Sequence, residues 1–576
     1  MSEFLPMSRA DMARLGWDAL DVLIVTGDAY VDHPAFGSAL LGRWLVSRGF
    51  RVGIVAQPRW DTPEDVARMG RPRLFAGVTA GALDSMLAHY TAFRKKRHDD
   101  AYTPGGRAGA RPNRATITYT SLVRHAFPGL PVAIGGIEAS MRRATHYDFW
   151  TDKLRRSILL DSKADLLVYG MAERAVLEVA QRLGGMAACR VPRDVLQGLR
   201  GTAFALSHGS DSSDRTHRTD RTDGTCWPLP SHEEIEADPK KLMAATLLLE
   251  RQVHNGTAWA VQAAGDQSVV FAPPAEPLST EELDALYALP FTRQAHPSYC
   301  EPIPAVEMIQ FSVTTHRGCA GGCSFCSLAL HQGRRIRSRS AASILTEVSR
   351  LTEHPKWKGS LSDVGGPTAN MWGARCTGDP ASCRRVSCLF PAICRNLKPD
   401  QSALAELLRA IARLPGVKHL RTASGVRHDL AMLADDYVRA LVGEFVGGQL
   451  KLAPEHRCDS VLRLMRKPRF EAFERFLTVF ERVSREAGKE QYVVPYLMSA
   501  FPGCTDADMR ELARWLKQRG WRPQQVQCFI PTPGTVATAM YWAGIDPDGK
   551  PIHVARTDAE RLRQHRILVP ARRREG

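Results

Sequence analysis

The sequence predicts an α/β protein, in which an open (β/α)6 barrel follows a doubly wound α/β domain. In the N-terminal third, apolar strands alternate with amphipathic helices, which is typical of a parallel sheet covered on both faces. From about residue 303, a pattern of strand, loop and helix occurs six times, which is typical of a barrel. The length of 576 residues is also too great for a single hydrophobic core.

These patterns divide the chain into four parts. We expect an N-terminal α/β domain over residues 1–205 and a barrel over 303–545 that carries a Cys-rich insertion at 371–399. Residues 206–302 are expected to be a low-complexity insertion and a helical connector, and 546–576 a basic tail.

The N-terminal domain begins with a βαβ unit. An apolar run at 21–28 predicts a buried parallel strand, 38–48 an amphipathic helix, and 51–56 the next strand. The remaining expected elements are strands at 73–78, 132–134 and 165–170 and a helix at 171–182. Residues 93–114 are a basic insertion rich in Gly and Pro, which is either a solvated loop or a lid over an anionic substrate.

The barrel strands end in small, polar or Pro/Gly residues, which are typical of the functional end of such a barrel. A helix is expected at 341–352. Strands are expected at 308–314, 359–364, 419–424, 449–453, 492–498 and 526–530.

The first barrel strand leads into three cysteines, Cys319, Cys323 and Cys326, in a C-x3-C-x2-C array. Three thiolates on one tight loop are able to hold three irons of a [4Fe–4S] cluster, and with no fourth cysteine nearby one iron stays open for chemistry. The alternatives are a zinc site with His316 or His331 as fourth ligand, or buried structural thiols.

This array resembles the signature loop of radical S-adenosylmethionine (SAM) enzymes. The resemblance implies that SAM chelates the open iron and that one electron from a reductant such as flavodoxin or ferredoxin releases a 5'-deoxyadenosyl radical. It also implies SAM contacts at strand ends, for which the matching candidates are Gly365, Gly366, Ser424, Arg427 and Glu455.

Four further cysteines, Cys376, Cys383, Cys388 and Cys394, lie within nineteen residues after the second strand. Their spacing fits neither the usual zinc ribbon nor a bacterial ferredoxin. We expect a second metal site here, which holds either an auxiliary iron–sulfur cluster or zinc. The alternative is that the four cysteines are scattered redox or structural thiols.

The order of elements in the N-terminal domain resembles the cobalamin-binding-type domain that precedes many radical SAM barrels. In that motif one residue separates Asp from His, whereas Asp32 and His33 are adjacent and Pro34 follows. We therefore expect cobalamin to be an unlikely cofactor.

Several stretches together resemble the YgiQ-type radical SAM family, whose members are uncharacterised. They are the residues at 25–34, 135–140 and 363–370, the cysteine loop, and the residues at 451–456.

Lys and Arg exceed Asp and Glu, with a formal net charge of +16, which suits a polyanionic partner. No apolar run of transmembrane length and no signal peptide is seen, so we expect a cytoplasmic protein with no membrane partner.

We therefore predict a radical SAM enzyme whose substrate is unidentified, with RNA or a protein as the leading classes. The alternative is a nucleic-acid-binding protein with a structural iron–sulfur or zinc site, which would bind RNA in a salt-dependent way without consuming SAM.

Overall fold

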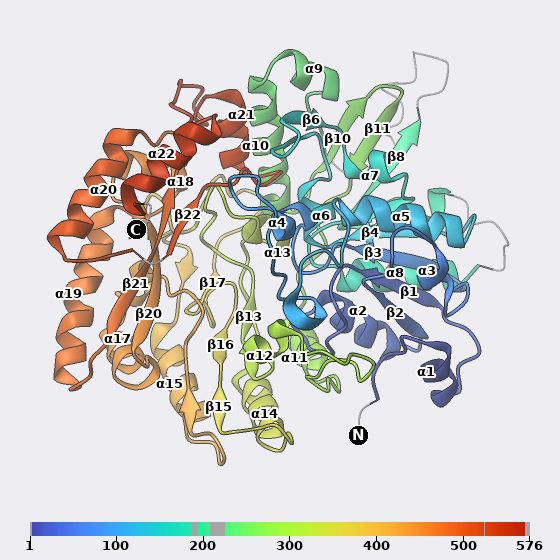
Figure 1. Ribbon diagram of the computed structural model, residues 1–576, viewed down its shortest axis with the longest axis horizontal. Coiled ribbons are helices and arrows are strands. Elements are labelled where there is room, and N and C mark those ends of the chain that lie inside the picture. The colour runs from blue at the N-terminus through green and yellow to red at the C-terminus, as the bar shows by residue number, and fades with distance from the viewer. Residues whose placement is uncertain (1–2, 187–192, 208–224, 524, 571–576) are drawn as a thin grey trace, which may run out of the picture. The chain divides into compact units, whose positions relative to one another are not determined.

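The computed structural model describes residues 3–186, 193–207, 225–523 and 525–570, and the chain forms two compact units (Figure 1). Unit 1 comprises Met1–Pro277, Ala285–Gln310 and Pro380–Ser382. Unit 2 comprises Leu278–Asp284, Phe311–Asp379 and Cys383–Gly576. Helix α11 (Thr280–Tyr287) lies where the chain passes between the two units.

Unit 1 is built on one nine-stranded sheet, in the order β2-β1-β3-β4-β7-β8-β11-β10-β9. The first five strands in this order run parallel, β8 turns antiparallel, and β10 and β11 form an antiparallel pair. The strands are β1 (Val22–Thr26), β2 (Val52–Ala56), β3 (Phe75–Thr79), β4 (Val132–Gly135), β7 (Leu166–Val168), β8 (Thr202–Ser207), β9 (Cys226–Pro228), β10 (Trp259–Ala264) and β11 (Gln267–Phe271).

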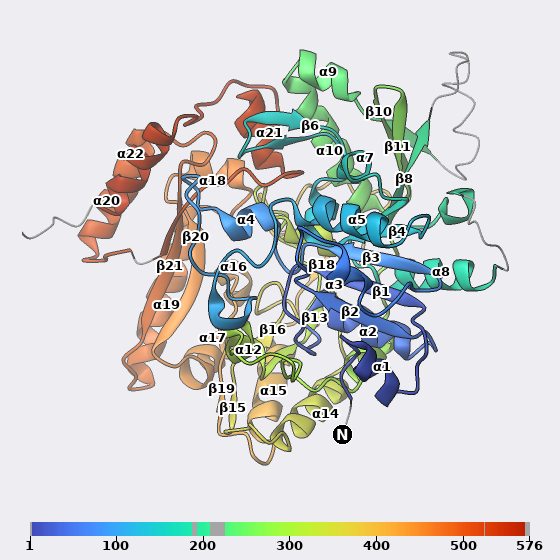
Figure 2. The ribbon, with the colours of Figure 1, turned by 45° about the vertical axis from the view of Figure 1, so that its right-hand side comes forward.

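Helices cover both faces of this sheet because successive residues of its strands point to opposite sides. Leu23 and Val25 of β1 belong to one apolar core with α5 (Ala115–Ala126), whereas Val22 and Ile24 belong to a second core with α2 (Gly37–Val46) and α8 (Glu173–Gly184). Figure 2 shows the central strands between these helices. The predicted doubly wound architecture of the N-terminal part is therefore confirmed.

The smaller elements of unit 1 connect these strands and helices. They are α1 (Arg9–Arg14), α3 (Glu64–Ala67), α4 (Ser85–His89), η1 (Pro104–Gly106), α6 (Gly136–Met141), β5 (His146–Asp148), β6 (Lys153–Arg155), α7 (Ile158–Ser162), η2 (Arg193–Leu196), α9 (His232–Ala237), α10 (Lys240–Asn255) and α12 (Pro304–Ile309).

Unit 1 extends further along the chain than the expected boundary at residue 205. Strands β9, β10 and β11 come from the expected connector, and backbone hydrogen bonds between β8 and β11 add them to the sheet. Because β7 pairs with β8 and β8 pairs with β11, buried apolar residues of β8, β10 and β11 continue the same core rather than linking two domains. Most of the low-complexity stretch, 208–224, lies outside the described residues.

Among the described residues, unit 2 contains seven parallel strand segments that pair in chain order, of which β15 and β16 are two consecutive parts of one strand. Pairing joins β12 to β16, β15 to β19 and β20 to β21 and β22, and a parallel bridge joins Val426 to Leu452. Within the described residues no pairing joins β22 to β12, so the barrel is open, as predicted. The strands are β12 (Ser312–Thr314), β15 (Ser360–Leu361), β16 (Asp363–Gly365), β19 (His419–Leu420), β20 (Gln449–Glu455), β21 (Tyr492–Ser499) and β22 (Gln525–Cys528).

Amphipathic helices cover the outside of these strands. In α19, for example, Phe473, Leu477 and Phe480 share one buried face at helical spacing. The helices are α13 (Leu328–Gln332), α14 (Ala341–Thr352), α15 (Gln401–Ala412), α16 (His428–Ala431), α17 (Asp435–Ala440), the π-helix η5 (Leu441–Phe445), α18 (Asp459–Met465), α19 (Phe470–Glu486), α20 (Asp506–Gln518), α21 (Val536–Ala543) and α22 (Asp558–Leu568).

One expectation for the barrel part differs from the structure. The first barrel strand begins at Ser312 rather than at 308, because Pro304 starts helix α12, which runs to Ile309. Part of the expected basic tail forms α22, in which Arg561 and Gln564 are buried and Gln564 donates to the carbonyl of Cys504. No helix in the described part of the chain is long and apolar enough to cross a membrane.

A substitution at Gly27, which follows β1, tests how closely the chain packs beside the parallel strands of unit 1. A Cβ added there would lie 2.2 Å from the carbonyl oxygen of Ala80, so we expect Gly27→Ala to destabilise the parallel strands by about 1–3 kcal/mol. Gly37→Ala is the matched control, because nothing lies within 4 Å of its added Cβ. Native-state hydrogen exchange of peptides from β1 and β3 measures both effects. Equal protection in the two variants would contradict this packing.

Candidate functional site

The predicted cluster loop lies directly after β12, at the carboxyl end of the first barrel strand. Strands β13 (His316–Arg317) and β14 (Arg337–Ser338) pair as a short antiparallel ribbon at the two ends of the segment that contains this loop. All three cysteines are free and half-buried. Backbone bonds hold the loop at both ends: the amide of Cys319 donates to Gly333, and that of Ser324 donates to Met465.

The three thiols face a common space. The sulfurs of Cys319 and Cys323 lie 3.4 and 3.6 Å from the point that a Cβ on Gly321 would occupy, so the glycine keeps the space between them open. Burial and, to a smaller extent, the neighbouring thiols of Cys323 and Cys319 raise the pKa of Cys326 to about 12. Three thiols this close are suited to a metal, which binds them as thiolates and replaces their protons.

A cluster and a single zinc ion differ in the spacing that they require of the sulfurs. Among the described residues, no three His, Cys, Asp or Glu side chains are arranged to hold one metal ion. One zinc ion at about 2.3 Å from each thiolate needs the sulfurs within roughly 4 Å of one another, whereas a four-iron cluster spreads them farther apart. His316, one of the two alternative zinc ligands, contacts Thr315 through Nδ1, and burial lowers its pKa to about 4.

Arg427 is the candidate SAM contact that lies nearest the cysteines. Its Nη1 is 3.9 Å from the sulfur of Cys323, and the side chain is buried. Its carboxylate partner in the structure is Asp429, to which Nε and Nη2 donate at 2.9 and 2.6 Å. Burial alone raises the pKa of Asp429, but the Arg427 guanidinium brings it down to about 2. The pair is therefore ionised beside the cysteine loop.

Two more candidates, Gly365 and Ser424, lie side by side. A Cβ on Gly365 would be 3.6 Å from Cβ of Ser424. The carboxylate of Asp363 holds this turn: it accepts from the Ser424 hydroxyl, from the Ser424 amide at 3.0 Å and from the Ala423 amide at 2.9 Å. Gly366 has a different neighbour, because a Cβ there would lie 2.7 Å from the ring of His316.

The last candidate, Glu455, ends β20 with a φ of +69°, a conformation that is strained for a residue with a side chain. Lys467 lies 3.2 Å from its carboxylate and donates to the carbonyl of Ala453 at 2.8 Å. The ammonium of Lys467 also helps to lower the pKa values of Cys319 and Cys326 against the effect of burial. Glu455 is thus tied to the cysteine loop through Lys467.

Sequence reasoning missed four residues of this arrangement: Asp363, Asn370, Asp429 and Lys467. Asn370 is completely buried and exchanges hydrogen bonds with the backbone of Arg427 at 2.8 and 3.0 Å. Asp429 had a local signal, since an acid two residues after an arginine is a ready partner for it. Asp363 and Lys467 had none, because their partners are distant in the sequence.

In unit 1, the polar residues after β4 form an internal network. Glu138 is buried and accepts hydrogen bonds from Ser85 and from the amide of Thr116, and Arg142 pairs with Asp84 and lies near Asp148. These contacts stabilise the loops at the strand ends.

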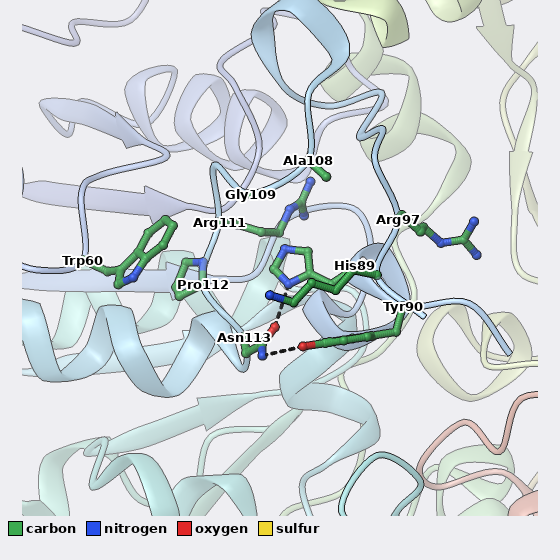
Figure 3. Close-up of a pocket in the computed structure, with 10 residues that line it drawn as sticks. Trp60, His89, Tyr90, Arg97, Ala108, Gly109, Arg111, Pro112 and Asn113 are labelled. Atoms are coloured by element: carbon green, nitrogen blue, oxygen red, sulfur yellow. Dashed lines mark hydrogen bonds between the residues drawn. The ribbon is translucent and has the colours of Figure 1, made fainter. Parts of the chain in front are cut away.

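A pocket of about 500 Å³ lies in unit 1 beside the basic insertion (Figure 3). Asn113 bridges His89 and Tyr90 through hydrogen bonds of 2.7 and 3.0 Å. The full lining comprises Trp60, His89, Tyr90, Lys96, Arg97, Ala108, Gly109, Arg111, Pro112 and Asn113. It therefore combines aromatic rings with exposed cations.

Comparisons with known proteins identify the family. The family model "Radical SAM N-terminal" matches residues 4–312, and "Radical SAM superfamily" matches 313–516. A UPF0313 protein of Geobacter sulfurreducens is 52% identical over 570 residues, which cover 98% of this chain and 92% of that protein. A UPF0313 protein of Thermotoga neapolitana is 47% identical and covers 96% of each chain. This chain belongs to the UPF0313 family of radical SAM proteins.

The predicted YgiQ-type assignment and the predicted enzyme class are thereby confirmed, with SAM and a [4Fe–4S] cluster as the cofactors of the superfamily. The substrate is not identified by these relatives, and the alternative of a binding protein with a structural metal site is not favoured.

The expectation that cobalamin is an unlikely cofactor was wrong. The radical SAM methyltransferase TsrM of Kitasatospora setae, solved with cobalamin and a [4Fe–4S] cluster bound, has the same fold over 90% of this chain and 74% of its own, with a TM-score of 0.50 and 15% identity. The N-terminal architecture is thus one that occurs in a cobalamin-bound enzyme, and the altered Asp-His spacing was a poor reason to set the cofactor aside.

The structure argues against one specific role for His33, that of a ligand to the cobalt of cobalamin. The ring is buried: Nδ1 accepts from the amide of Ala35, and Nε2 lies 3.0 Å from the guanidinium of Arg293. With both nitrogens occupied, His33 does not fit the role of a cobalt ligand in this arrangement.

Proposed function

We propose that Cys319, Cys323 and Cys326 hold the [4Fe–4S] cluster at which this enzyme reductively cleaves SAM to begin radical chemistry on an RNA substrate. The observation that carries the first part is the cysteine loop itself, in which sulfurs face one another around Gly321 with a buried ion pair beside them. When bound, the cluster supplies the electron that breaks a carbon–sulfur bond of SAM, after a flavodoxin- or ferredoxin-type reductant has provided it.

The side chains around the loop have distinct tasks in this proposal. Arg427 and Lys467 place positive charge beside thiolates that carry negative charge once iron is bound. Asp363 fixes the turn at Ser424, and the strained backbone at Glu455 fixes the end of β20, so both strand ends present a rigid rim for SAM. The ring of Phe325 packs edge-on against the ring of Phe501, with 6.1 Å between the ring centroids, and keeps water from one side of the loop.

Cys323→Ala tests the cluster assignment. We expect anaerobically purified wild-type protein to form 5'-deoxyadenosine from SAM and dithionite, and the variant to fall to the background rate because two thiolates do not retain the cluster. Mass spectrometry of the nucleoside product measures the rate. Cys300→Ala is the control, since Cys300 is exposed in unit 1 and is expected to leave the rate unchanged. Equal rates in Cys323→Ala and wild type would overturn the assignment.

The pocket in unit 1 supports the choice of RNA. Its cations, Lys96 and Arg97, are exposed, and Trp60 and Tyr90 offer ring faces on which bases stack. The formal net charge of +16 also favours a polyanionic partner such as RNA. A cation-and-aromatic lining recognises a nucleotide chain better than it recognises an average protein surface.

Salt dependence tests the RNA assignment. Fluorescence anisotropy with labelled single-stranded RNA gives the binding constant at several salt concentrations. For a Lys96→Ala, Arg97→Ala double variant we expect the slope of log K against log salt to fall by about 1 to 2, because two phosphate contacts are lost. A Lys163→Ala, Lys240→Ala variant, with two exposed cations removed outside the pocket, is the control. An unchanged slope in the pocket variant, or crosslinking of the enzyme to protein alone, would contradict the assignment.

A further inference from the structure

The four cysteines of the Cys-rich insertion come together although they are spread along nineteen residues of chain. A two-residue ladder between β17 (Arg375–Cys376) and β18 (Leu397–Lys398) places Cys376 opposite Leu397. The amide of Leu397 donates to the carbonyl of Cys394 at 2.9 Å, and the amide of Cys394 donates to the carbonyl of Cys388 at 2.7 Å. A continuous chain of backbone contacts thus joins three of the four cysteines.

Two of the four cysteine side chains lie on one small apolar core. Cys388 and Cys394 pack against a cluster that includes Leu389 and Leu397. The thiols of Cys376, Cys394 and Cys383 all act electrostatically on the Cys388 thiol, so Cys383 lies near the other three cysteines. All four are free thiols, so no disulfide accounts for their gathering.

The surroundings suit an anionic metal group rather than four neutral thiols. Arg334 places positive charge near the Cys388 thiol. Arg385 folds its guanidinium back onto the carbonyls of Ser387, Phe390 and Ala392, which stiffens the turn that carries Cys388. A cluster held by four thiolates carries net negative charge, and guanidinium groups next to the ligands offset it.

A cluster and a zinc ion differ in the spacing that they require of the thiolates. One zinc ion would need its four thiolates within roughly 4 Å of one another, whereas a four-iron cluster holds them farther apart. The chain belongs to an iron–sulfur family, which favours iron at the second group as well.

We propose that Cys376, Cys383, Cys388 and Cys394 hold a second [4Fe–4S] cluster, with all four irons ligated by the protein. Unlike the group at Cys319, this one has no iron left open, so its task is structural or electron-conducting rather than binding of SAM.

The second site is joined directly to the first loop. The amide of Cys388 donates to the carbonyl of Ala320 at 3.0 Å, and the hydroxyl of Ser387 donates to the carbonyl of Gly321. At Gly322, where φ is +58°, an added Cβ would lie 2.5 Å from the carbonyl oxygen of Val386. The backbone that carries Cys388 is therefore the support of the loop that carries Cys319 and Cys323, and filling the second site fixes this support.

Iron counting with Mössbauer spectroscopy tests the proposal on the whole chain. After anaerobic reconstitution with iron and sulfide, we expect about eight irons per wild-type chain, all in four-iron clusters. A variant with Cys376, Cys383, Cys388 and Cys394 changed to Ala is expected to retain about four at most. Cys300→Ala is the control and is expected to keep about eight. About four irons in the wild type, or bound zinc in place of the second set, would overturn the proposal.

A second variant separates this inference from the proposed function. With Cys319, Cys323 and Cys326 changed to Ala, we expect about four irons to remain and SAM cleavage to cease. If this variant holds no iron while the wild type holds four, the second cluster is absent and the first assignment stands. If it keeps all the iron that the wild type holds, the first assignment fails and the second stands. The wild-type count does not depend on whether either variant folds.

Discussion

The rest of the site depends on the way distant segments hold the backbone of the cysteine loop. Three thiols on eight residues are able to face one space only if the loop cannot relax. Its amides and carbonyls bond to residues 333, 388 and 465, and the amide of Ala537 donates to the carbonyl of Ser324. These partners come from both early and late parts of unit 2, so the loop reaches its working shape only when the whole unit has folded.

Electrostatics around the loop follow from this enclosure. Burial opposes ionisation of the thiols, and Arg427 and Lys467 act against that effect. The guanidinium of Arg427 would itself be costly to bury without Asp429, which keeps the pair neutral overall. The region is thus rigid, and its positive and negative charges almost cancel. Such a region is suited to bind iron, sulfide and SAM, which carries a sulfonium charge.

Sequence reasoning predicted the parts of this arrangement that are local in the chain. The cysteine spacing, the parallel strands and helix α14 at 341–352 are patterns within a few dozen residues. It did not predict Asp363 beneath Ser424 or Lys467 beside Glu455, because these contacts form only when strands far apart in the sequence pair. It also treated 226–271 as a connector, since β10 and β11 lack a strong apolar alternation and join the sheet through β8. The dismissal of cobalamin failed because one altered motif was weighed above the architecture of a whole domain.

One short stretch of backbone links the two cysteine groups. The open iron is therefore best located with a spectroscopic method that detects SAM bound directly to the metal. The most direct measurement is electron–nuclear double resonance on the reduced protein, with SAM labelled by ¹⁵N at the amino group and ¹⁷O at the carboxylate. We expect hyperfine coupling of both labels to the cluster, and loss of this coupling in Cys323→Ala. A reduced cluster whose spectrum is unchanged by SAM, with no coupling to either label, would contradict the assignment of the open iron to this loop.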